Sequence, residues 1–165
     1  MTFDAAPTGR DRPSLDLDAT ESLTVCDLSG AERFLVWAIR WAGSRQEDAG
    51  FADLCLQDSF DRAGLAGALP AFRRYVAAMH RDPLPCPALA RLGCWRMNAV
   101  ETHTLHALAC LQARRFGDAW RTLARVCPPL NAARAMLSLG ELAEALDAQA
   151  VSVRAWRRSS DRDGG

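Results

Sequence analysis

Five side chains with the ligand chemistry of a zinc site lie close together in the sequence. These thiol and imidazole groups belong to Cys86, Cys94, His103, His106 and Cys110. At about 100° per residue, the last three share one face of a predicted helix, and the proline-rich segment before it could fold Cys86 and Cys94 over that face. Because the spacing is irregular and contains no Cys-x-x-Cys pair, we expect no complete metal site, and zinc binding is kept as an alternative.

The same helix face could instead provide thiol chemistry. Arg114 continues the face, and a neighbouring cation lowers the pKa of a thiol, which would make Cys110 more reactive. A free cysteine also packs as a small hydrophobe, and the two histidines would then be surface or half-buried polar residues. A metal-binding or thiol-based sensor is therefore the alternative function.

The basic residues are unevenly distributed along the chain. All 20 are arginines, and the formal net charge is zero. Residues 1–61 contain 12 acids and 5 arginines (5 − 12 = −7), whereas residues 62–165 contain 15 arginines and 8 acids (15 − 8 = +7). The basic part could contact an anion or a partner, and the candidate contacts are Arg114, Arg115, Arg121 and Arg125. Alternatively, the acidic first part folds back on the basic middle, or the arginines are simply solvated.

Sequence motifs of common enzymes are missing. The chain has no glycine-rich phosphate loop, no Gly-x-Ser-x-Gly and no His-Glu-x-x-His, so we predict no catalysis; an enzyme with an unrecognised site is a further alternative. Beside its arginines, the predicted helix from Asp118 offers only Thr122 for reading bases, which argues against sequence-specific nucleic-acid binding. The sequence favours a small non-catalytic helical interaction or regulatory module with a protein partner.

Helical periodicity dominates the chain from Ser29 onward. Ser29 with Glu32 and Asn98 with Glu101 form two capping boxes that begin helices. Further apolar stripes predict helices near 51–60, 65–79, 118–127 and 129–146, whereas only 23–25 and 151–153 resemble strands. The sequence therefore predicts an all-α, single-domain bundle of five or six helices built from antiparallel hairpins.

Two residues on these stripes have consequences for the site. Glu101 lies on the leucine stripe of its helix, where its capping role explains it and no partner for its carboxylate is visible. Trp120 is placed on the inner face of its helix together with Ala119 and Leu123.

Composition predicts the domain organisation. Residues 1–24 are polar and read as a flexible acidic arm, residues 25–158 as the helical domain, and residues 159–165 as a polar tail. No basic stretch followed by an apolar run is found near Met1, and the longest clean apolar run, 34–39, is too short to cross a bilayer. We therefore expect a cytoplasmic protein without a membrane partner, whose six cysteines are reduced.

Overall fold

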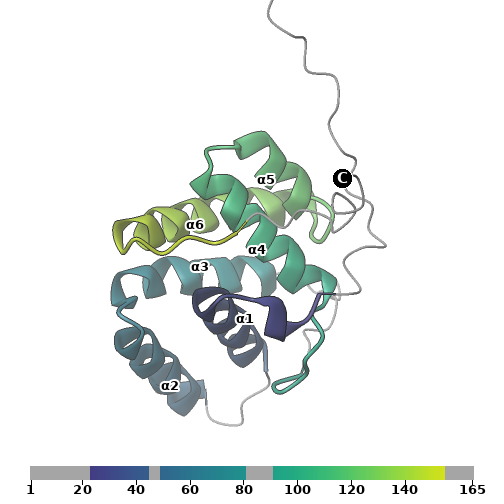
Figure 1. Cartoon of the computed structure of the whole chain (residues 1–165). Helices are drawn as coiled ribbons and strands as arrows, with labels where there is room; N and C mark the ends of the chain where they lie inside the picture. Colours follow the sequence, from purple (N-terminus) through teal and green to yellow (C-terminus); the bar gives the residue numbers. More distant parts are fainter. Residues whose placement is uncertain (1–22, 45–48, 81–90, 155–165) are drawn as a thin grey trace, which may run out of the picture.

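A computed structural model describes residues 23–44, 49–80 and 91–154 of the chain (Figure 1). The described residues form six α-helices: α1 (Gly30–Gly43), α2 (Ala49–Arg62), α3 (Leu69–His80), α4 (Ala99–Gln112), α5 (Phe116–Leu123) and α6 (Pro129–Ala148). Two short 3-10 helices, η2 (Val25–Asp27) and η3 (Ala66–Ala68), precede α1 and α3. Within this part of the chain, the only β-pairing is one isolated bridge between Thr24 and Arg96. The all-α, single-domain bundle is confirmed.

Both predicted capping boxes are present. Ser29 Oγ accepts a hydrogen bond from the Glu32 amide at 3.3 Å, and the Glu32 carboxylate accepts one from the Ser29 amide at 2.7 Å. Asn98 and Glu101 make the equivalent pair of bonds at 2.9 and 3.1 Å. These bonds satisfy amides that a helix start leaves without partners, so α1 and α4 begin where the sequence predicted.

Several predicted boundaries were wrong. The helix predicted from residue 65 begins at Leu69, because the chain first forms η3. The next-to-last helix, α5, begins at Phe116 with Arg115 as its N-cap, so Asp118 lies in its first turn and is not the cap. The segment 151–153 is not a strand; Val153 donates its amide to Gln112 Oε1 at 2.8 Å.

The core surrounds α4, which packs against α5 and α6 and contacts α1 (Figure 1). Helix α3 packs extensively against α6. Almost every residue of α4 is buried, including both sides of the helix, so it has no solvent face along most of its length. All six α-helices contribute to the largest fully buried apolar side chains, which are Leu35, Phe60, Phe72, Tyr75, Leu105, Leu108, Leu123, Leu139, Leu142 and Leu146.

Three helices end in the same left-handed turn. The residue after the C-cap has a positive φ at Gly64 (71°), Arg114 (58°) and Ala150 (54°). The following amide then bonds back to a carbonyl in the last turn: Leu65 to Phe60 at 2.8 Å, Arg115 to Cys110 at 2.8 Å and Val151 to Leu146 at 2.9 Å. This is the Schellman arrangement, in which glycine is favoured because a Cβ is strained at positive φ.

Replacing Ala150 with glycine is expected to stabilise the protein. Left-handed backbone costs a residue with a Cβ about 1–2 kcal/mol, and the added freedom of glycine in the unfolded chain offsets part of the gain, which leaves about 0.5–1 kcal/mol. Urea denaturation measures this difference. Gly64→Ala is the matched control and should destabilise by a similar amount, because nothing lies within 4 Å of a Cβ added there. Equal stability of both variants and the wild type would contradict the assignment of strain.

Candidate interaction surface

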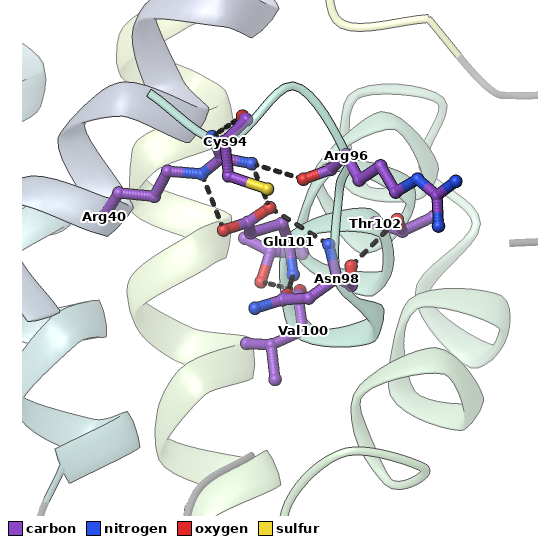
Figure 2. Close-up of polar contacts among 8 residues, drawn as sticks. Arg40, Cys94, Arg96, Asn98, Val100, Glu101 and Thr102 are labelled. Atoms are coloured by element: carbon purple, nitrogen blue, oxygen red, sulfur yellow. Dashed lines mark hydrogen bonds and ion pairs between the residues drawn. The ribbon is translucent and has the colours of Figure 1, made fainter. Parts of the chain in front are cut away.

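A buried ion pair joins α1 to the start of α4 (Figure 2). Arg40 Nε and Nη2 donate to the two carboxylate oxygens of Glu101, each at 2.8 Å. The same guanidinium donates to the carbonyl oxygens of Cys94 and Arg96, the latter at 2.9 Å. Arg40 is 5% exposed and Glu101 is fully buried. This partner was not visible in the sequence because it lies 61 positions away in another helix.

The Arg40–Glu101 pair has a structural role, because its polar atoms are bound within the protein. The two arginine nitrogens facing Glu101 and both carboxylate oxygens are engaged, and Glu101 also accepts the Asn98 amide. Fully hydrogen-bonded buried charges of this kind hold elements in register. The pair therefore fixes the segment before α4, and with it the direction in which α4 carries its side chains.

A second buried glutamate anchors the last described residues. Glu32, fully buried, accepts the Arg154 amide at 2.8 Å and its guanidinium at 2.9 Å. Burial by itself raises the pKa of Glu32, but the hydrogen bonds from Arg154 and Ser29 outweigh it and hold the pKa below the ordinary 4.5. Arg154 also donates to the Asp27 carbonyl at 2.9 Å, so the last described residue is tied to the segment just before α1.

The Glu32–Arg154 contact predicts a pH dependence of stability. Because the folded-state pKa of Glu32 is lowered, its contribution is complete above pH 4.5 and is lost as the pH falls through the folded-state pKa. We expect Arg154→Gln to be less stable than the wild type near neutral pH, with a difference that shrinks below pH 4.5. Thermal melts between pH 3 and 7 measure it. Arg33→Gln, at an exposed position of α1, is the control; the same pH-dependent difference in both variants would contradict the prediction.

Three of the predicted metal ligands lie on α4, Cys94 lies in the segment before it, and Cys86 lies outside the described residues. His103 and Cys110 are buried on α4, His106 is half-buried there, and Cys94 is half-buried beside Arg40. His103 Nδ1 donates to the Ala99 carbonyl at 2.6 Å. In the described ranges, no three His, Cys, Asp or Glu side chains gather so that they could hold a metal ion.

The face of α4 that carries the histidines packs against α5. Charges near α5 act on it: Arg125 on His103, and Arg115 and Asp118 on both His106 and Cys110. The sequence could not show this because it depends on how the α4–α5 turn folds back.

Burial sets the protonation of this covered face. It lowers the pKa of His103 and His106, and nearby arginines lower both further. It raises the pKa of Cys110, although the charge of Arg115 acts in the opposite direction. The cation that acts on the Cys110 thiol is thus Arg115, and not Arg114 as the sequence suggested. Burial outweighs the lowering of the thiol pKa that a neighbouring cation causes. Cys110 is a buried, protonated thiol at neutral pH, which is the opposite of what a reactive thiolate requires.

Helix α5 and the residues that flank it carry exposed aromatic and basic side chains. We call this the basic–aromatic surface, formed by Arg114, Arg115, Phe116, Trp120, Arg121 and Arg125. Phe116 is 53% exposed and Trp120 39%, and the two lie one turn apart on the same side of the helix. The placement of Trp120 on the inner face was wrong, because α5 buries only a narrow face formed by Ala119, Thr122 and Leu123.

Positive charge dominates this surface. Residues 114–125 contain four arginines and one acid, Asp118, which gives 4 − 1 = +3. Asp118 forms ion pairs with Arg121 and, at 3.7 Å, with Arg115. In contrast, Arg73 on α3 has a carboxylate of its own, Asp53, at 2.7 Å. The surface can therefore attract an anionic group while its rings offer apolar contact area.

The strained turn at Arg114 lies at one end of this surface. Arginine at φ 58° costs about 1 kcal/mol relative to glycine. Ala150 occupies the equivalent turn after α6 at the same kind of cost, so the two positions differ in charge and not in backbone strain. This pair provides a matched test of the Arg114 side chain.

Comparisons with protein families, with curated proteins and with solved structures found no match to this chain. Among the described residues, no helix is both long enough and apolar enough to cross a membrane.

Proposed function

We propose that this protein is a small non-catalytic interaction module that binds another protein through the basic–aromatic surface. The observation that carries the proposal is the exposure of Phe116 and Trp120 on a short helix that carries Arg121 and is flanked by further exposed arginines. Aromatic residues and arginine are enriched at protein interfaces and among the residues that dominate binding energy. Among the described residues, Cys26, Cys55, Cys94 and Cys110 are free thiols, which supports our placement of the module in the cytoplasm.

The partner that this surface fits is an acidic segment with interspersed apolar residues. Carboxylates would pair with Arg114, Arg115 and Arg121, while an aliphatic or aromatic side chain covers Phe116 and Trp120. We favour protein over nucleic acid because Thr122, the residue beside these arginines that could read bases, is 2% exposed.

Selection from a random-peptide phage library with the full chain as bait tests this proposal. We expect the selected peptides to be enriched in Asp and Glu around at least one large apolar residue. Their affinity should fall when the salt concentration rises, because the arginine contacts are screened. Arg114→Gly should weaken binding, whereas Ala150→Gly relieves the same backbone strain and should leave binding unchanged.

Three results would overturn the proposal. The first is a set of peptides without acidic enrichment. The second is binding that Arg114→Gly and Ala150→Gly affect equally. The third is a fluorescently labelled single-stranded oligonucleotide that binds the basic–aromatic surface more tightly than every selected peptide, since aromatic and arginine side chains also stack on bases.

A further inference from the structure

We propose that the basic–aromatic surface is occupied within the same chain by the acidic segment 14–21, Ser-Leu-Asp-Leu-Asp-Ala-Thr-Glu, which competes with the protein partner. The proposal rests on the function proposed above and names an intramolecular ligand for the same surface. Charge complementarity is the first argument. The segment carries Asp16, Asp18 and Glu21 without a basic residue, a charge of −3, against +3 for residues 114–125.

The side-chain pattern of the segment matches the surface. In extended backbone, Leu15 and Leu17 lie on one side and Asp16 and Asp18 on the other. Helix α5 also separates apolar from charged side chains. Phe116 and Trp120 form one exposed row, and Arg121 lies about 100° further around the helix axis. Between the rows lies Gly117, above which nothing occupies the 4 Å around an added Cβ, so a backbone can approach closely there.

The point at which the described chain begins brings the segment within reach. The Leu23 carbonyl accepts a hydrogen bond from the Met97 amide at 3.1 Å. The first described residue therefore lies beside the N-terminal end of α4. Helix α5 runs back toward that end, since the charge of Arg125 acts on His103 in the second turn of α4. An extended chain spans about 3.3 Å per residue, so Asp18 reaches roughly 16 Å from Leu23 and Asp16 roughly 23 Å. The whole of α4, at 14 residues, is about 21 Å long.

The other end of the chain does not offer this complement. Residues 155–165 carry Arg157, Arg158 and Arg162 against Asp161 and Asp163, so their formal charge is 3 − 2 = +1. A positive segment would be repelled by the basic–aromatic surface. The acidic segment near the N-terminus is therefore the occupant to test.

Nuclear magnetic resonance of the full chain tests the proposal directly. The variant Asp16→Asn/Asp18→Asn removes two negative charges and changes no residue of the helical domain. We expect its amide signals over 114–125 and the Trp120 indole N–H signal to differ from those of the wild type. Raising the salt concentration should move the wild-type signals toward those of the variant. Asp4→Asn/Asp11→Asn removes the same charge outside the segment and should leave these signals unchanged.

Affinity for a selected acidic peptide provides the second readout. Release of the internal segment should tighten peptide binding by about 3–10-fold in Asp16→Asn/Asp18→Asn, because a tethered competitor acts at a high effective concentration. Identical signals over 114–125 in the wild type and this variant, or equal tightening in Asp4→Asn/Asp11→Asn, would overturn the proposal. If the signals differ but no peptide binds, the internal contact stands and the proposed function fails. If peptides bind both proteins equally, the function stands and the internal contact fails.

Discussion

Replacing Arg40 with methionine is expected to lower the free energy of unfolding by about 3–5 kcal/mol, because one partner of a buried ion pair is removed. Glu101 would be left fully buried with an uncompensated charge, and the carbonyls of Cys94 and Arg96 would lose their donor. Methionine fills part of the volume of the arginine stem, so the loss reports on the polar contacts more than on a cavity. Urea denaturation followed by circular dichroism measures the change.

An exposed ion pair provides the control for this prediction. Arg62 pairs with Asp58 at 2.9 Å, with side chains 79% and 59% exposed, and Arg62→Met should cost about 0.5 kcal/mol or less. Arg40→Lys keeps the charge but cannot form the bidentate contact, so its cost should lie between the two. If Arg40→Met and Arg62→Met lowered the free energy of unfolding by similar amounts, the Arg40–Glu101 ion pair would not be the contact that holds α4 against α1.

Truncating Trp120 to alanine is expected to weaken binding of a selected acidic peptide by about 30-fold or more, which corresponds to a loss of about 2 kcal/mol. The reason is that a large, half-exposed ring offers contact area that costs little conformational entropy to order. Phe116→Ala should have a smaller effect of the same sign. Isothermal titration calorimetry well below the melting temperature separates this loss from any effect on folding.

Leu137 on α6 is the matched control for Trp120. Its side chain is 73% exposed and lies on another helix, so Leu137→Ala should leave peptide affinity within about 2-fold of the wild type. The interpretation of α5 as the binding element would be wrong if Leu137→Ala weakened binding as much as Trp120→Ala does.

The local features of the fold could be predicted from the sequence. The capping boxes at Ser29 and Asn98 start α1 and α4 where expected, because the bonds they make join residues only three positions apart. Pro129 starts α6 for a similarly local reason, since the missing N–H of proline costs nothing at a first helical position. Apolar spacing at 3.6 residues was sufficient to predict the all-α class.

Contacts between distant residues could not be predicted in this way. Glu101 had a visible capping role but no visible partner, because Arg40 is far away in the sequence and only the packing of α1 on α4 brings it near. For the same reason the sequence did not show that α5 packs over His103, His106 and Cys110. The physical cause is that a periodicity shows which side chains share a face, but not which element lies opposite that face.

The sequence by itself determined where α1, α4 and α6 begin, the excess of arginine in the second part of the chain, and the candidate contacts Arg114, Arg115, Arg121 and Arg125. Only the tertiary structure decided that Trp120 is partly exposed and that Cys110 is sealed beneath α5. An eight-residue helix at the edge of a bundle buries just one narrow face, whereas the central α4 is covered on nearly all sides. Both helices carry apolar residues at helical spacing, and only their positions in the bundle determine how much of each is removed from water.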